Sequence, residues 1–343
     1  MSTSKELRRA GVDATLDEAA GIAERIIRNV GRVIVGKDEV VRLVLAAFAC
    51  RGHVLLEDVP GTAKTMLARA IALSIAGEAA RIQCTPDLQP TDVTGLSVWD
   101  PQERRFEFRP GPIFANVLLV DEINRALPKA QSALLEGMAE RQVTVDGTSR
   151  PLPSPFFLIA TENSIEQEGT FPLPEAQLDR FFLRTSLGYP TLEQELEILD
   201  SQLHGHPLDR LQPVVATDDL AELAAAVEEV YVDPLLKRWA VELVRATRSL
   251  EQVEVGASVR ASLSLERAVR AWALFAGRSY VVPADVERLF EPVVGHRLVL
   301  GVDFVVDAES LDREELGRVI WEACLAQAPR PHPDWDEDRF GRG

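Results

Sequence analysis

The chain has 343 residues, of which 46% are hydrophobic and 27% charged, and its formal net charge is −17. This composition is typical of a soluble globular protein of about two domains, and no apolar run reaches the roughly 18 residues of a membrane span. Because contacts of Lys and Arg with phosphates supply most non-specific affinity for nucleic acids, the acidic balance argues against a dedicated DNA or RNA binder.

The first predicted domain, residues 1–190, alternates short apolar strands with helices. Its polar beginning, residues 1–21, has no signal-like apolar run, so we expect neither a signal peptide nor a membrane anchor. A helix is predicted at 15–30, where Thr15 and Glu18 suit a capping box. Further helices are predicted at 37–52 and 65–77, and strands at 53–58, 80–84, 116–122, 156–162 and 181–187. This alternation predicts an α/β fold with a parallel sheet of five strands, flanked by helices.

The second predicted domain, residues 191–300, is helical. Gly188, Tyr189 and Pro190 mark its boundary with the first domain. Apolar residues then recur every three or four positions in 191–203, 217–230, 233–250, 263–277 and 283–298. This period predicts a small all-helical domain. Residues 301–343 are predicted to form a tail with one helix, 312–326, and a partly disordered end.

A candidate phosphate-binding loop reads EDVPGTAKT at residues 57–65, between a predicted strand and a predicted helix. The general pattern is G-x-x-x-x-G-K-[ST], but Asp58 and Ala63 stand at its two glycine positions. Gly61 would let the backbone approach phosphates, Lys64 could reach the β- and γ-phosphates, and Thr65 could hold Mg²⁺. By itself the loop does not decide between a nucleotide site and a chance match, because Asp58 brings an anion close to phosphates unless its side chain points away.

Polar residues farther along the chain support the nucleotide site. The apolar strand NVLLVDE ends in Asp121, which would lie beside Mg²⁺, and Glu122, which would polarise a water for attack on the γ-phosphate. Asn163 leaves the next strand and could orient the same water. Arg180 precedes the last predicted strand, and Arg260 stands at a helix start in the second domain. A lone arginine is usually a surface residue, but two in these places favour a functional role.

Together these stretches resemble the AAA+ ATPases, and within them the MoxR family. The resemblance spans roughly residues 15–300 and is carried by several stretches at once. These are VIVGKDEVV, LLEDVPGTAKTMLARAIA, DLQPTDVTGLSVWD, FEFRPGPIFANVLLVDEINRALPKAQSALLEGMAERQVTVDG, LIATENS, LPEAQLDRF and GASVRAS. The family accepts Ala before the loop lysine and Asp at the first glycine position, which favours a working site. Lys37 and Val259 depart from its usual Gln and Pro, and neither departure removes a reacting group.

The resemblance implies ATP and Mg²⁺ as cofactors and a role for each site residue. Lys64 and Thr65 resemble Walker A, Asp121 and Glu122 Walker B, Asn163 sensor 1, Arg180 the arginine finger acting on a neighbouring subunit, and Arg260 sensor 2. Mg²⁺ would be held by Thr65 and Asp121. Nucleotide contacts are implied for Val35, Gly36, Pro60, Gly61, Thr62, Ala63, Lys64, Thr65 and Met66. Residues 94–108 and 141–156 resemble the hairpins inserted in such domains.

Several functions remain open at this stage. The first is an ATP-hydrolysing, chaperone-like machine that remodels, matures or activates a partner. The second is a nucleotide-dependent regulatory binding module, in which ATP is a switch. The third is a DNA-handling AAA+ ATPase, which the net charge of −17 and the lack of an added zinc or winged-helix segment disfavour.

The resemblance also implies the assembly and the partner. It predicts a homo-oligomer, a hexameric ring, that works with a protein carrying a von Willebrand factor A domain. We expect no nucleic-acid partner, and any link to a membrane would be indirect, through a partner protein. The three scattered cysteines, Cys50, Cys84 and Cys324, favour a reducing compartment and therefore the cytoplasm.

Overall fold

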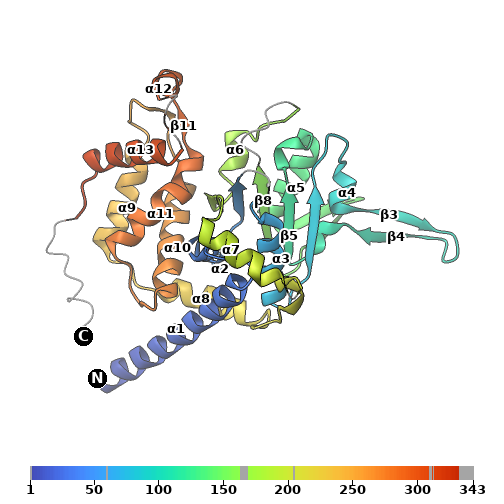
Figure 1. Ribbon diagram of the computed structural model, residues 1–343, viewed down its shortest axis with the longest axis horizontal. Coiled ribbons are helices and arrows are strands. Elements are labelled where there is room, and N and C mark those ends of the chain that lie inside the picture. The colour runs from blue at the N-terminus through green and yellow to red at the C-terminus, as the bar shows by residue number, and fades with distance from the viewer. Residues whose placement is uncertain are drawn as a thin grey trace. The chain divides into compact units, whose positions relative to one another are not determined.

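The computed structural model of the protein describes residues 2–58, 61–162, 169–203, 205–308, 311 and 313–331 (Figure 1). The chain forms two compact units. One comprises Glu24–Phe181 and Thr185–Ala221, and the other comprises the first part of helix α1, Phe182–Arg184 and the chain from Glu222 onward. The domain boundary at residue 190 stays a prediction, because compactness alone does not show that a segment folds independently.

The central feature of the fold is a sheet of five strands in the order β2-β5-β8-β1-β9. Neighbours β2–β5, β5–β8 and β8–β1 pair in parallel, and all five strands lie where the sequence predicts them. Their bounds are β1 Val54–Glu57, β2 Ala79–Gln83, β5 Val117–Asp121, β8 Phe157–Glu162 and β9 Leu183–Thr185. The carboxyl ends of β2, β5, β8 and β1 therefore lie at one edge, where ligands of α/β sheets usually bind.

Helices cover both faces of this sheet. Leu118 and Val120 of β5 lie in a buried cluster with residues of α4 and α5. On the opposite face, the ring of Phe157 in β8 packs at 4.9 Å from that of Phe48 in α2. Because side chains alternate along a strand, the odd-numbered residues of β5, Asp121 among them, face the same side as Phe157. The helices are α2 Asp38–Ala49, α3 Lys64–Ser74, α4 Pro90–Thr94, α5 Pro128–Glu140, α6 Glu175–Leu178 and α7 Leu192–Gln202, with short 3₁₀ helices η1 Pro112–Phe114, η2 Ile123–Arg125 and η3 Pro207–Arg210.

Helix α1 differs from its prediction. It spans Ser2–Gly31, so Thr15 and Glu18 lie inside the helix, and the capping box at residue 15 is wrong. The upstream segment contains no proline and many good helix formers, so nothing in it ends the helix before residue 15.

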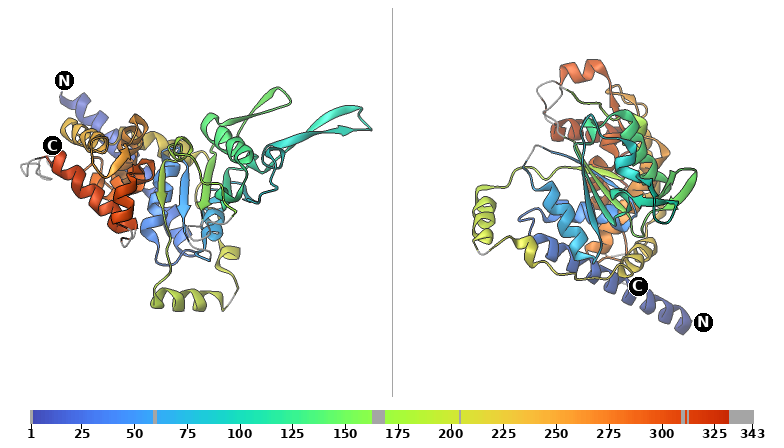
Figure 2. Two further views of the ribbon diagram at one scale, coloured as in Figure 1. Left: turned by 90° about the horizontal axis from the view of Figure 1, so that it is seen from above. Right: turned by 90° about the vertical axis from the view of Figure 1, so that its right-hand side faces the viewer.

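Two β-hairpins are inserted in the core, as the sequence predicts. The first pairs β3 Gly95–Asp100 with β4 Arg105–Pro110, and the second pairs β6 Gln142–Val145 with β7 Thr148–Pro151. The first hairpin projects well beyond the sheet (Figures 1 and 2). The guanidinium of Arg150 in the second lies 3.8 Å from the ring centre of Phe108 in the first, so the two hairpins touch.

The unit that contains the C-terminal half is mainly helical. Trp239 is buried there, and the ring of Trp321 lies 6.4 Å from it and 5.0 Å from that of Phe290. A short antiparallel pair, β10 Val253–Val255 with β11 Val299–Leu300, adds to the predicted all-helical domain. Its helices are α9 Pro234–Ala246, α10 Val259–Phe275, α11 Pro283–Val294, α12 Val302–Asp307 and α13 Arg313–Gln327, with η4 Gly295–Arg297, and α8 Asp219–Glu229 precedes them. None of the helices among the described residues has the length and apolar character needed to cross a membrane.

Candidate nucleotide-binding site

The candidate phosphate loop connects the end of β1 to the first turn of α3. Gly61 has φ +87° and Ala63 has φ +63°, both in the left-handed region. Ala63 is the N-cap of α3, and the helix begins at Lys64. Such a loop presents backbone N–H groups at the positive end of a helix dipole, which favours an anion. Thr62 is buried and Met66 half-buried, while Pro60 lies outside the described residues.

The carboxylate of Asp58 points away from the loop. Its Oδ2 atom accepts hydrogen bonds from the backbone N–H of Leu187 at 2.6 Å and of Gly188 at 3.2 Å. Both donors follow β9, and Asp58 is buried. The negative charge is therefore held by backbone donors on the far side of β1. The Asp58 carboxylate therefore need not repel a phosphate bound in the loop.

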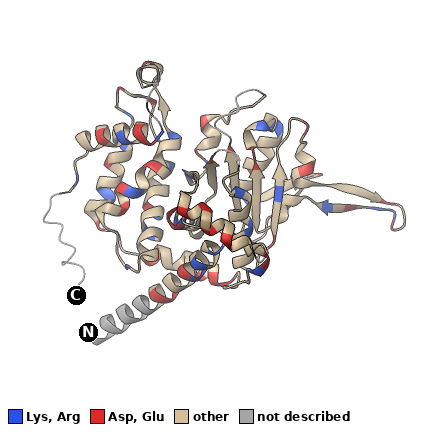
Figure 3. Cartoon of the chain, viewed as in Figure 1, with Lys and Arg blue, Asp and Glu red and all other residues tan. Residues whose placement is uncertain are grey.

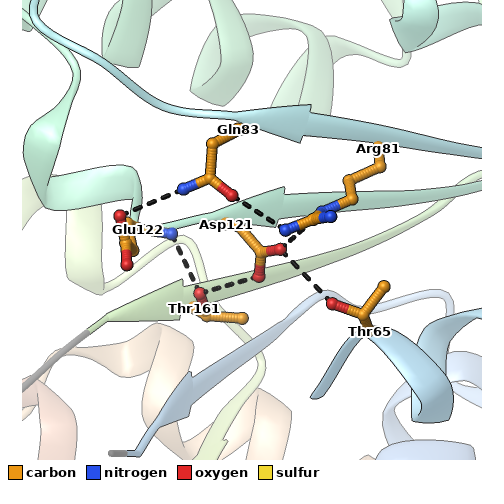
Figure 4. Close-up of polar contacts among 6 residues, drawn as sticks. All are labelled: Thr65, Arg81, Gln83, Asp121, Glu122 and Thr161. Atoms are coloured by element: carbon orange, nitrogen blue, oxygen red, sulfur yellow. Dashed lines mark hydrogen bonds and ion pairs between the residues drawn. The ribbon is translucent and has the colours of Figure 1, made fainter. Parts of the chain in front are cut away.

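Lys64 and Thr65 of the loop contact the ends of two different strands, β1 and β5. Lys64 Nζ donates to the carbonyl oxygen of Asp58 at 2.9 Å. Thr65 Oγ1 donates to Asp121 Oδ2 at 3.4 Å, across the space between α3 and β5 (Figure 4). The structure thus brings together Thr65 and Asp121, which lie 56 positions apart in sequence.

Asp121 and Glu122 are held by Thr161 of β8. The Thr161 hydroxyl donates to Asp121 Oδ1 at 3.2 Å and accepts from the backbone N–H of Glu122 at 2.9 Å. Glu122 has φ +55°, a strained conformation for a residue with a Cβ. Its Oε2 accepts from Gln83 Nε2 at 3.0 Å and from Arg125 Nη1 at 3.2 Å. The side chain of Glu122 is consequently directed along the carboxyl edge of the sheet.

Sequence reasoning missed the roles of Arg81, Gln83 and Thr161 in this site. Arg81 Nε donates to Asp121 Oδ2 at 2.7 Å, and Arg81 Nη2 donates to Gln83 Oε1 at 2.8 Å (Figure 4). The signal was present: Arg81 and Gln83 alternate on a predicted strand that could lie beside the Asp121 strand. The sequence did not give the strand order. In the structure β2 pairs with β5, and Gln83 lies opposite Asp121.

The segment at Val35 and Gly36 contacts helix α7. Gly36 has φ +68°, and its carbonyl oxygen accepts from Gln194 Nε2 at 3.2 Å. Lys37 Nζ donates to the carbonyl oxygen of Tyr189 at 2.9 Å. The departure from the usual Gln at position 37 therefore keeps a hydrogen-bond donor. The implied contact of Val35 and Gly36 with adenine stays a prediction.

The two predicted arginines make hydrogen bonds of their own. Arg180 Nη1 donates to the carbonyl oxygen of Leu135 in α5 at 2.9 Å. Arg260 is exposed in the first turn of α10, where its backbone N–H donates to Ser258 Oγ at 3.1 Å, and it belongs to the other compact unit. Asn163 lies outside the described residues. The finger and sensor roles of these three residues stay predictions.

Burial removes one nearby nucleophile from consideration. Cys84 follows β2, and its backbone N–H donates to the carbonyl oxygen of Asp121 at 2.9 Å. Burial, followed by the negative charges of Asp121 and Glu122, raises the pKa of the Cys84 thiol to about 12. The thiol therefore stays protonated at neutral pH and is a poor nucleophile.

The donor set fits Mg²⁺ in chemical terms. The Thr65 hydroxyl and the Asp121 carboxylate are hard oxygen ligands, and their hydrogen bond already brings them together. Magnesium in nucleotide sites is commonly held by one or two such groups together with phosphates and waters. Bound there, the ion would neutralise charge on the β- and γ-phosphates. The residues of this chain would hold it through Thr65 and Asp121.

The chain is similar to known proteins over most of its length. Residues 53–183 match the ATPase family associated with various cellular activities (AAA), and residues 245–315 match the AAA lid domain. An uncharacterised Bacillus subtilis protein, YeaC, is 46% identical over 86% of this chain and 93% of its own length. Chaperone MoxR1 of Mycobacterium tuberculosis is 43% identical over 89% of this chain and 82% of its own. A crystal structure of a candidate ATPase from Cytophaga hutchinsonii aligns with TM-score 0.83 and 36% identity, covering 93% of this chain and 98% of that one.

Proposed function

Because the chain belongs to the MoxR family of AAA+ ATPases, we propose that it hydrolyses ATP in order to remodel, mature or activate a partner protein. The observation that carries this proposal is the hydrogen bond from Thr65 Oγ1 to Asp121 Oδ2, with Glu122 as the next residue in the chain. These are the groups that the reaction needs for a metal and an attacking water, placed at the end of a phosphate loop.

The reaction would be in-line attack of water on the γ-phosphate, governed by position and charge. Lys64 would pair with the phosphate oxygens after leaving the carbonyl of Asp58. Glu122 would accept the proton of the attacking water, and Thr161 would keep its backbone in place. Arg180 of a neighbouring subunit would offset the charge that develops on the leaving group, which makes a ring of copies, a hexamer, part of the proposal.

Two substitutions test the ATPase. Lys64→Ala should lose nucleotide binding, because the loop then faces the phosphates without its cation. Glu122→Gln should bind ATP and hydrolyse it on the order of 10²–10⁴ times more slowly, since an amide is no general base. Binding is measured with a fluorescent ATP analogue and turnover by phosphate release. Hydrolysis at the wild-type rate by Glu122→Gln would exclude Glu122 as the base.

The first hairpin is the surface that we propose for the partner. Trp99 and Phe106 are 48% and 71% exposed, yet their rings lie 5.2 Å apart in an edge contact across the two strands. Leu96 on β3 is also exposed. Aromatic side chains of this kind commonly anchor protein partners. The resemblance suggests a partner with a von Willebrand factor A domain.

Capture of such a partner tests this surface. Glu122→Gln with ATP should retain it, and nucleotide-free Lys64→Ala should retain much less, because ATP drives a change only through different affinities in two states. Adding Phe106→Ala to Glu122→Gln should abolish capture. Leu235→Ala is a matched control, since Leu235 on α9 is also largely exposed, at 62%. Equal capture by both nucleotide-site mutants would favour a passive binding module.

The DNA-handling alternative has less support. Lys and Arg residues are interspersed with Asp and Glu in the view of Figure 3, and the net charge is −17. Filter binding at low salt would reveal a nucleic-acid affinity if one exists. A cytoplasmic location is also part of the proposal, because the three cysteines, Cys50, Cys84 and Cys324, are scattered along the chain and buried.

A further inference from the structure

We propose that Arg81 is a built-in competitor of Mg²⁺: its guanidinium holds the metal-facing oxygen of Asp121 until the ion displaces it. This inference rests on the proposed function, because it assigns Mg²⁺ to Asp121. Its basis is the pair of contacts at one atom. Asp121 Oδ2 accepts from Arg81 Nε at 2.7 Å and from Thr65 Oγ1 at 3.4 Å.

The two oxygens of Asp121 have different surroundings. Oδ1 receives the Thr161 hydroxyl, which fixes the carboxylate from the side of β8. Oδ2 faces Thr65, the other predicted metal ligand, and this is the oxygen that Arg81 occupies (Figure 4). A metal shared by Thr65 and Asp121 would therefore use the same oxygen as the guanidinium.

Charge and geometry favour competition over sharing at this oxygen. Mg²⁺ demands near-octahedral coordination at short distances and keeps several waters around it. A guanidinium at hydrogen-bond distance from the same oxygen crowds that shell and repels the ion. The low exposure of Asp121, whose side chain is 8% accessible, weakens the screening of this repulsion.

Arg81 is held firmly enough to occupy the oxygen and loosely enough to leave it. Its Nη2 donates to Gln83 Oε1 at 2.8 Å, which orients the guanidinium toward Asp121. The side chain is nevertheless 53% exposed, so its charge can return to water at low cost. A half-exposed ion pair of this kind contributes little free energy, which Mg²⁺ can overcome.

As a consequence, the negative charge of Asp121 is neutralised by Arg81 before Mg²⁺ binds. Without Arg81, the carboxylate of Asp121 would lose its ion pair with the guanidinium, while Glu122 would keep its own ion pair with Arg125. With Arg81 present, Mg²⁺ binds only when its interaction with Asp121 is stronger than that of the guanidinium. Arg81 is therefore a positioning residue that sets the Mg²⁺ concentration at which the nucleotide is held.

The test is the Mg²⁺ dependence of nucleotide binding by the full chain. A fluorescent ADP analogue is used at a fixed concentration, because ADP cannot be hydrolysed further at this site, and Mg²⁺ is titrated from EDTA upward. Arg81→Gln should lower the Mg²⁺ midpoint about fivefold, the size expected for a partly exposed pair. A merely structural role would not tighten metal binding.

Arg238→Gln is the matched control. Arg238 Nε also lies 2.7 Å from a carboxylate, that of Glu242, so the substitution removes the same charge and a similar contact far along the chain. Its Mg²⁺ midpoint should equal that of the wild type. An equal shift in Arg238→Gln would attribute the effect to net charge and overturn the proposal.

Other outcomes are equally decisive. A midpoint of Arg81→Gln equal to or above the wild type would show that Arg81 aids or ignores the metal. If that variant does not fold, Arg81→Met, which also removes the charge, gives the same reading: a lower midpoint supports competition, and an equal or higher one overturns it. Failure of the wild type to bind the analogue at any Mg²⁺ concentration would instead overturn the proposed function, and this inference with it.

Discussion

The carboxylate of Asp58 accepts a hydrogen bond of 2.6 Å from the backbone N–H of Leu187, residues 129 positions apart in the chain. A second bond from Gly188 completes the contact. Asp58, which replaces the first glycine of the general phosphate-loop pattern, thus links the end of β1 to the segment after β9. Its place in the loop is structural, and the loop's working groups lie farther along.

Restoring the general glycine at this position should therefore harm the protein. Asp58→Gly removes a buried, charged acceptor from two backbone donors, so the free energy of unfolding should fall by about 2 kcal/mol. Urea unfolding of the nucleotide-free protein measures it. Ala63→Gly is the matched control: at φ +63° glycine relieves strain, and stability should rise by about 0.5–1 kcal/mol. An Asp58→Gly variant as stable as the wild type would contradict the structural role.

Thr161 should matter both for stability and for turnover. Thr161→Val keeps the shape of the side chain but removes its bonds to Asp121 and to the backbone of Glu122. Leaving these buried partners unpaired should cost about 2 kcal/mol in the free energy of unfolding, and ATP hydrolysis should slow because Glu122 is no longer held. Thr161→Ser keeps the hydroxyl and should retain most of both. Full retention of stability and turnover in Thr161→Val, with losses in Thr161→Ser, would mean that the methyl group, not the hydroxyl, is what the site needs.

Arg180 should act on the nucleotide of a neighbouring subunit. Arg180→Ala should bind ATP but hydrolyse it roughly 10³–10⁵ times more slowly, the range found for such fingers. Mixed with Lys64→Ala, it should regain activity, because one mutant keeps the pocket and the other the finger. Arg180→Lys, which can still donate to Leu135, separates a local packing effect from loss of the finger. No recovery in subunits shown to co-assemble would place the action of Arg180 within its own chain.

His53 should make the protein less stable in acid. Its Nδ1 accepts from the backbone N–H of Leu158 at 3.0 Å, and its Nε2 lies 3.2 Å from the carbonyl oxygen of Met138, so the folded protein holds the neutral ring. Burial lowers the pKa of His53 from 6.5 to about 4, with the charge of Arg141 acting in the same direction and the Met138 carbonyl opposing.

The direction of the pH effect on stability depends on which state, folded or unfolded, binds the proton of His53. Between pH 6.5 and 4 the unfolded chain protonates His53 and the folded protein does not, so stability falls as pH decreases through this window. The loss should total about 3 kcal/mol at its lower end. Unfolding by urea at a series of pH values measures it, and His53→Gln should flatten that part of the profile. An unchanged slope in the variant would assign the acid sensitivity to other groups.

The sequence by itself predicted the strands and named the candidate reacting groups. The strands are short apolar runs whose period is local, so all five were found within a few residues of their observed bounds. Lys64, Thr65, Asp121 and Glu122 could be named because each follows a predictable strand or opens a predictable helix. The order of these motifs along the chain then indicated the family.

The tertiary structure alone decided which partners those groups meet. The direction of the Asp58 side chain depends on donors that follow β9, and the hold of Arg81 on Asp121 depends on β2 lying beside β5. Nothing local to Asp58 or Arg81 encodes these contacts, because they join strands that are sequentially distant and become neighbours only through the order of the sheet. Local periodicity fixes where a strand runs, but the energy of a charge depends on what surrounds it after folding.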